Sequence, residues 1–318
     1  MDNMNKQLLK IVYGDYTLGV HGKGFHCIFS YGMGGIESLV KDGIEWIYRS
    51  PKPTFWRALT DNDRGSGFHF KSGMWLSADM FIKCIEKKVI VDGVDLGLPC
   101  APKNNRFSNK EYANTVVVSF TYETITNPAT TVEVSYTVTE NEEIRVDTYY
   151  HGTEGLPQLP VFGIRFIMPT LAERFEYEGL SGETYPDRKA GAVKGVYMVE
   201  KPALTPYLVP QECGMRMDTE WVVVYRRTTL NNSDKGKDEH MLKIRKADTS
   251  FHFSCLPYTA CEIENATHHE ELPPARRTVL GIYAAVRGVG GIDSWGSDVE
   301  KQYHIDAEKD ICFSFVIC

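Results

Sequence analysis

Apolar and polar residues alternate along much of this chain. In the segment 115–122, Val118, Phe120 and Tyr122 occupy every second position, with Ser119 and Thr121 between them. A two-residue period of this kind is typical of antiparallel strands with one buried face. Segments rich in β-branched and aromatic residues predict strands at 25–31, 115–122, 130–138, 143–150, 161–168, 221–225, 250–256, 278–285 and 311–317.

Helical periodicity is nearly absent. The best candidates are the segment 77–87 and a short turn near Asp187. A (β/α)₈ barrel needs long amphipathic helices between its strands, so this chain does not form one. We predict an all-β fold in which residues 1–318 make one large antiparallel sandwich whose two halves share a core.

Charge and cysteine use narrow the classes of partner. The formal net charge is −7, and no basic run carries interleaved aromatics, so nucleic acid is not expected as a partner. No stretch approaches the roughly 18 apolar residues of a membrane span, and the first ten residues lack a signal-peptide core.

Eight cysteines without CxxC spacing favour reduced thiols and a cytoplasmic protein. Only His268 and His269 are adjacent, so no metal bound by this chain alone is expected.

A first polar segment follows the prolines at 51 and 53. Phe55 and Trp56 can anchor it, and a turn crowded with polar side chains follows. These polar residues are Arg57, Asp61, Asn62, Asp63 and Arg64, with Gly65 and Gly67 behind them. Two interpretations remain open: the aspartates pair with the arginines and cap backbone amides, or the loop contacts a partner or a sugar.

A second segment contains Glu183, Asp187 and Arg188. Two carboxylates are the minimum for glycoside hydrolysis. Spacing of this kind is common, however, and an ion pair with Arg188 that stabilises the turn is the favoured interpretation.

A third segment, 287–296, has three glycines in four positions, followed by Asp293, Ser294 and Trp295. The spacing of its glycines resembles that of a phosphate-binding loop, but neither a lysine nor a long helix follows it. A flat indole on a loop suits the apolar face of a sugar ring, and Asp293 could bond the hydroxyls. The alternative is a buried tryptophan that seals the edge of the sandwich.

Four motifs in this order resemble the C-terminal domain of long β-galactosidases of glycoside hydrolase family two, which in some lactic-acid bacteria is a separate small subunit. They are Pro53-Thr54-Phe55-Trp56-Arg57-Ala58, Thr60-Asp61-Asn62-Asp63-Arg64-Gly65, Tyr185-Pro186-Asp187-Arg188, and Gly290-Gly291-Ile292-Asp293-Ser294-Trp295. The resemblance runs from about residue 13 to residue 316.

The resemblance implies a supersandwich similar to galactose mutarotases, and a heterodimeric enzyme that hydrolyses β-galactosides such as lactose with retention. The two catalytic Glu residues, Mg²⁺ and Na⁺ are then expected on a large-subunit partner, with no catalytic residue in this chain. Trp295 looks like the tryptophan placed beside the active site, with Asp293 and Ser294 as its neighbours. Gly65 begins a stretch that resembles a mobile loop, in which Phe68 replaces the family's charged residue.

Two other functions stay open. A lone supersandwich could be an aldose epimerase, which needs a His acid and a Glu base. The candidate histidines are His151, His252, His268 and His269. Alternatively, the chain is a carbohydrate-binding module without a share in catalysis.

Overall fold

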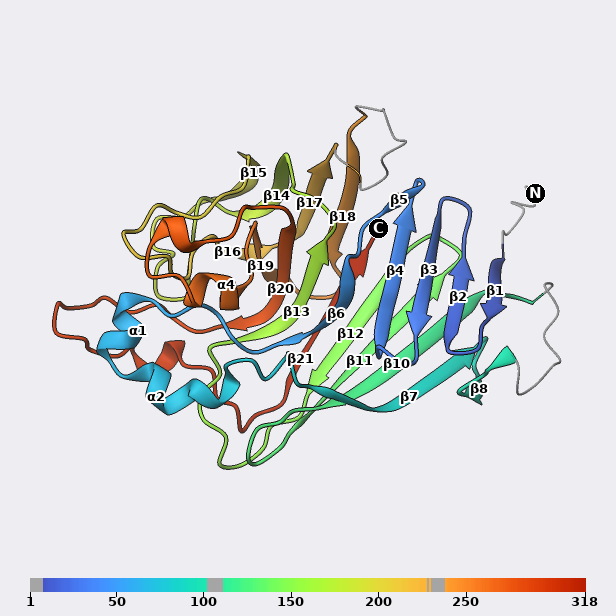
Figure 1. Ribbon diagram of the computed structural model, residues 1–318, viewed down its shortest axis with the longest axis horizontal. Helices are drawn as coiled ribbons and strands as arrows, with labels where there is room; N and C mark the ends of the chain where they lie inside the picture. The colour runs from blue at the N-terminus through green and yellow to red at the C-terminus, as the bar shows by residue number, and fades with distance from the viewer. Residues whose placement is uncertain (1–7, 102–110, 228, 230–237) are drawn as a thin grey trace.

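The computed structural model describes residues 8–101, 111–227, 229 and 238–318. These residues form three β-sheets in which every paired strand is antiparallel (Figure 1). The fold is therefore all-β and antiparallel, as the alternating pattern predicts. No helix in the described ranges is long and apolar enough to cross a membrane.

The first sheet has six strands and comes almost wholly from the N-terminal part of the chain. Its spatial order is β5-β4-β3-β2-β1-β9. The strands are β1 (Leu9–Tyr13), β2 (Thr17–His21), β3 (Phe25–Ser30), β4 (Gly35–Lys41), β5 (Ile44–Glu45) and β9 (Tyr112–Ala113).

The second sheet has ten strands in the order β15-β14-β17-β18-β21-β12-β11-β10-β7-β8. The strands are β7 (Lys83–Val91), β8 (Val94–Gly97), β10 (Thr115–Glu123), β11 (Thr131–Thr139), β12 (Ile144–Tyr150), β14 (Arg174–Leu180), β15 (Lys194–Glu200), β17 (Trp221–Arg226), β18 (His240–Lys246) and β21 (Ile311–Ile317). The C-terminal strand β21 lies between β12 and β18, so it joins the two halves of this sheet.

The third sheet has five strands in the order β16-β19-β20-β13-β6. They are β6 (Arg49–Thr54), β13 (Val161–Met168), β16 (Arg216–Thr219), β19 (Phe251–Leu256) and β20 (Thr278–Val286). The helices are short. They are α1 (Asp61–Gly65), α2 (Phe68–Ser72) and α4 (Ala260–Glu264), with 3₁₀ turns at Gly73–Trp75, His269–Glu271 and Lys301–Tyr303.

The core follows from the strand register. Val118 of β10 is opposite Tyr136 of β11, and Tyr136 is opposite Val146 of β12, which in turn faces Phe315 of β21. All four side chains are buried, because the two-residue period places each on the inner face of its strand.

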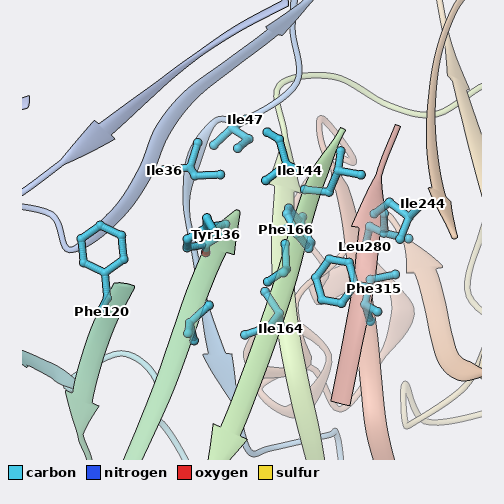
Figure 2. Packing of buried hydrophobic residues seen from close by; sticks show 14 of the residues in the cluster. Ile36, Ile47, Phe120, Tyr136, Ile144, Ile164, Phe166, Ile244, Leu280 and Phe315 are labelled. Carbon is cyan, nitrogen blue, oxygen red and sulfur yellow. The ribbon is translucent and has the colours of Figure 1, made fainter. Parts of the chain in front are cut away.

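The other two sheets cover this inner face. Phe29 of β3 lies 5.6 Å from Tyr136, and Phe166 of β13 lies 6.0 Å from Phe315, both measured between ring centroids. Figure 2 shows Phe166 and Phe315 within one apolar cluster that also contains Ile164 and Leu280. The ten-stranded sheet is therefore one layer of a sandwich, and the two smaller sheets pack against it.

The nine predicted strands are confirmed, and the structure adds further strands and short helices that were not predicted. Each of the nine predicted segments overlaps a strand. The predicted helix at 77–87 is wrong, because the chain turns after Ser77 and then enters β7. Residues of β7 pair with β10 along its length, and this tertiary pairing outweighs a weak local helical preference. The prediction of one domain over 1–318 stays a prediction.

All eight cysteines are described, and each is a free thiol. The expected reduced state therefore agrees with the fold, in which Cys27, Cys213 and Cys255 are buried.

Candidate functional site

Segments far apart in the sequence meet at one end of the molecule. They contain α1 and the residues leading to it, the turn at 183–188, the segment 205–212, and the loop 287–299. In Figure 1, α1 and α2 lie at the end of the molecule opposite β1 and β2. All three polar segments singled out in the sequence contribute to this end.

The first helix begins with a complete capping box. The Thr60 hydroxyl accepts a hydrogen bond from the Asp63 amide, and the Asp63 carboxylate accepts one from the Thr60 amide. These two hydrogen bonds give partners to two backbone amides that have none within the helix. The residues 61–65, expected as a polar turn, therefore form a five-residue helix.

The Asp63 carboxylate also lies between two buried guanidinium groups. Arg57 donates to both carboxylate oxygens, at 2.6 and 3.2 Å, and Arg287 donates to Oδ1 at 3.2 Å. Arg287 has no solvent-exposed side-chain area, and it also pairs with Asp298. The network joins α1 to a loop more than 200 residues away.

The pKa shifts show how this network is balanced. Burial alone raises the pKa of Asp63, but the charge and hydrogen bonds of Arg57 outweigh it, so the pKa of that carboxyl is lowered. Burial lowers the pKa of Arg57, but Asp63 outweighs this effect and the pKa is raised. For Arg287, burial dominates over its two acidic partners, and its pKa is lowered. The charges of Arg57 and Asp63 therefore stabilise each other enough to outweigh the loss of water, whereas the charge of Arg287 is only partly compensated.

A second set of contacts fixes the backbone of the glycine-rich loop. Asp187 accepts hydrogen bonds from the amides of Val289 and Gly290, at 2.8 to 3.1 Å. Asn62 donates to the Val289 carbonyl at 3.0 Å, and Arg188 donates to the carbonyls of Gly290 and Gly291. The backbone of the loop is therefore fixed through its amides by Asp187 and through its carbonyls by Asn62 and Arg188.

Gly65 and Gly296 lie in direct contact. A Cβ atom added at Gly296 would come within 2.8 Å of the Gly65 carbonyl carbon, and Gly296 has a φ of +81°. Both the close approach and the positive φ require glycine at 296. The loop that carries Trp295 is thus packed on the end of α1.

Trp295 itself extends into solvent, with 92% of its surface exposed. The alternative of a buried tryptophan is wrong. Asp293 accepts hydrogen bonds from the Trp295 amide at 2.9 Å and from the amide and hydroxyl of Ser297. Both Asp293 oxygens are therefore used within the loop, where they fix the backbone that presents the indole. The Ser297 hydroxyl and these amides lower the pKa of Asp293, which stays ionised.

Beside the loop lies a cavity of about 610 Å³. It is lined by Thr60, Asp61, Asn62, Glu183, Tyr185, Arg188, Thr205, Tyr207, Gln211, Glu212, Val289 and Gly290. Several of these groups are fixed by neighbours, because Gln211 accepts from the Asp61 amide at 2.9 Å and Glu183 accepts from Thr205 at 2.7 Å. The cavity wall therefore carries many polar side chains and is largely preformed.

Glu212 is the unusual group in this wall. It is buried, and its Oε1 accepts a hydrogen bond from the Tyr185 hydroxyl at 3.3 Å. Burial is the main reason that the pKa of Glu212 rises to about 8, against a lowering by Arg57 and a further rise from Glu183. Glu212 is thus a neutral acid near pH 7, whereas most carboxyls are ionised there.

The structure decides between several sequence interpretations. Arg57 and Asp63 are buried, so they support the loop from inside, while Asp61 and Gly65 are exposed. The predicted ion pair of Arg188 with Glu183 or Asp187 is wrong, because Arg188 binds carbonyl oxygens and Asp187 binds amides. Gly67 has a φ of +70° and is the N-cap residue that precedes α2. Whether Asp293, Ser294, Trp295 and the loop residues touch a sugar or a partner stays a prediction.

The four histidines do not form a cleft with a glutamate. His151 pairs with Glu133 and His268 with Glu271, in both cases on the surface. His269 bonds the Tyr207 carbonyl, and the ring of His252 accepts from the Asp218 amide. Burial lowers the pKa of His252 to about 4, so it is neutral in most conditions. None of these contacts resembles the acid and base pair of an epimerase.

Potential metal-ligating side chains are scattered over the described residues. Among them, no group of three or more His, Cys, Asp or Glu side chains is arranged to hold an ion. That Mg²⁺ and Na⁺ lie on a large subunit stays a prediction.

Comparison with known proteins shows to which family the chain belongs. A family model described as "Beta galactosidase small chain" matches residues 21–317. The chain belongs to this family. A small-chain member, the "Beta-galactosidase small subunit" of Latilactobacillus sakei, is 59% identical over 100% of this chain and 99% of its own length.

The small chain also matches part of longer proteins. A "Beta-galactosidase" of Halalkalibacterium halodurans is 33% identical over 97% of this chain, but the match covers only 28% of that protein. Solved structures that resemble the chain include a galactose mutarotase-like protein from Lactobacillus casei ATCC 334, with a TM-score of 0.41 at 9% identity over 95% of this chain and 99% of that one. A likeness this distant says nothing about function.

Two functional candidates were missed in the sequence. Glu212 follows Pro210 and Gln211 without any local pattern that marks it, and Arg287 stands at the start of a glycine-rich run whose glycines and Trp295 are the conspicuous residues. Their importance comes from burial and from partners that are distant in the sequence, which spacing along the chain does not show.

Proposed function

We propose that this chain is the small subunit of a two-chain β-galactosidase that hydrolyses terminal β-D-galactosides such as lactose. The observation that carries the proposal is the full-length match to a beta-galactosidase small subunit at 59% identity. The match to 28% of a longer beta-galactosidase supports it, since that protein contains a region similar to this whole chain as one of its parts.

The all-β fold supports this division of labour. The described residues form antiparallel sheets and short helices, which do not build a barrel active site. The catalytic acid, the nucleophile and the Mg²⁺ and Na⁺ ions are therefore assigned to the large subunit. We expect the assembled enzyme to work in the cytoplasm.

Trp295 is the part of this chain that we assign to the substrate. An indole face packs well on the C–H groups of a sugar ring, because it offers a large, flat apolar surface. Three sets of contacts hold the loop that carries Trp295. They are the hydrogen bonds that Asp293 accepts, the contact between Gly65 and Gly296, and the ion pairs of Asp63. Placement is thus prepared before substrate arrives, which lowers the entropic cost of binding.

The test is complementation. The full chain is mixed with the large subunit of a two-chain β-galactosidase, and lactose hydrolysis is measured for each chain alone and for the mixture. We expect hydrolysis only in the mixture, with a single complex by size-exclusion chromatography. Full hydrolysis by the large subunit without this chain would remove the proposal.

A further inference from the structure

The cavity beside the glycine-rich loop has the size and preformed wall of a ligand site. Its volume of about 610 Å³ falls within the range of roughly 300–1,000 Å³ found for small-molecule pockets. The wall comes from four separate segments, and each is tied to another by the hydrogen bonds described above. A ligand would meet fixed groups rather than side chains that must first be ordered.

The charges in the wall favour a neutral ligand. Arg188 is the cationic side chain of the lining, and it already binds the carbonyls of Gly290 and Gly291. Asp61 and Glu183 are acidic, so a phosphate or carboxylate would be repelled. A divalent cation would need more ligands than the described residues gather at one point.

The polar atoms that remain for a ligand suit hydroxyl groups. Of the hydrogen bonds among described residues, Glu183 uses only Oε2 and Glu212 only Oε1, so one oxygen of each carboxyl remains. The remaining Glu183 oxygen can accept from a hydroxyl, whereas a protonated Glu212 also donates to one. The Tyr207 side chain is 41% exposed and offers both a hydroxyl and an aromatic face.

We propose that this cavity binds a neutral pyranose or a similar polyol through Glu183, Glu212 and Tyr207. Its wall does not include Trp295, so the site has binding groups of its own. A pyranose matches the alternation of donors, acceptors and aromatic surface, and it carries no charge to oppose the acidic wall. The choice of galactose as first probe rests on the proposed function, while the cavity does not depend on it.

The experiment is a titration of the full chain with D-galactose, followed by ligand-observed NMR near pH 7. Inorganic phosphate and Mg²⁺ are titrated in parallel. We expect millimolar binding of galactose and none of either ion. Glu183→Ala and Tyr207→Ala should each weaken galactose binding at least tenfold, with Glu37→Ala and Tyr16→Ala as exposed controls that bind like the wild type.

Two comparisons make the test decisive. Trp295→Ala should leave the dissociation constant within twofold of the wild type. If Trp295→Ala abolishes binding and the cavity variants do not, the sugar binds at the indole and the inference is wrong. Binding of phosphate or Mg²⁺ without binding of galactose would also overturn it. Failure of lactose complementation with retained galactose binding would remove only the proposed function.

Protonation of Glu212 supplies an independent readout. The charged or titratable groups around it are Arg57, Asp63, Glu183, Tyr185, Cys213 and Tyr283. With a pKa of about 8, its proton is lost as the pH rises through that value. Galactose affinity should then fall severalfold between about pH 6.5 and pH 9, and Glu212→Gln should remove that fall. A pH-independent affinity in the wild type would contradict the role given to Glu212.

Discussion

The two ends of the molecule are stabilised in different ways. Near β10, β11 and β12, every second side chain faces an apolar core, and the residues between them face outward. Near α1 and Trp295, buried positions include Arg57, Asp63 and Arg287, which bond one another. The first arrangement tolerates small changes by repacking, whereas the second depends on a complete set of charges.

This difference suggests a separation of roles. A buried ion network has well-defined bond directions, so it fixes the position of the loop that carries Trp295 more closely than apolar contact alone. The cost is desolvation, and it is offset only while every partner is present.

Removal of Asp63 should have the largest effect. Asp63→Ala leaves Arg57 and Arg287 buried without their shared carboxylate, and loss of one partner of a buried pair costs about 3–5 kcal/mol. Chemical denaturation measures the loss. The control is Asp61→Ala, whose exposed carboxylate lies 3.6 Å from Arg64 and should matter by less than about 0.5 kcal/mol. Equal losses for both variants would show that the network is not stabilising.

Truncation in the apolar sandwich should come next. Ile144 of β12 is buried, and Ile144→Ala should cost about 2–4 kcal/mol through lost burial and a partly collapsed cavity. Ile85 of β7 is half exposed and offers a matched control, with an expected cost below about 1 kcal/mol for Ile85→Ala. Chemical denaturation of the two variants measures both losses of unfolding free energy, and a larger loss for Ile85→Ala would contradict the assigned core.

The pH dependence of stability should depend on Glu212. Its folded pKa of about 8 is raised above the ordinary value, so its contribution is fully present below the unfolded pKa and is lost as pH rises through about 8. Between about pH 5 and pH 9, Glu212→Gln should therefore lose less stability than the wild type, with a difference of about 1–3 kcal/mol. Urea denaturation at each pH measures it. Parallel curves for the two proteins would place the pKa of Glu212 near its ordinary value.

Trp295→Ala should have the smallest effect on stability, below about 0.5 kcal/mol, because the indole is almost wholly exposed. In the two-chain complex, the same variant should raise KM severalfold while the complex still assembles. Steady-state lactose kinetics provide the measurement, with Tyr16→Ala as a control on another exposed aromatic residue. Unchanged kinetics would remove Trp295 from the substrate site.

Local pattern accounted for much of the fold. Alternation in β10, β11 and β12 was sufficient to predict these strands, because side chains of a strand face opposite sides at every step. It was not sufficient for β7, where only pairing with β10 favours a strand. The candidate site was predicted in part, since Trp295 and the α1 segment stood out by composition, while Glu212 did not.

The sequence by itself determined alternating strands such as β10, β11 and β12, the absence of a helical barrel pattern and the glycine-rich loop that carries Trp295, since each depends on neighbouring residues. Only the tertiary structure decided that Asp63 lies between Arg57 and Arg287, that Gly65 contacts Gly296, and that Glu212 is buried beside Tyr185. Burial and long-range contacts set the charge state and position of a side chain, and neither can be deduced from the residues next to it in the sequence.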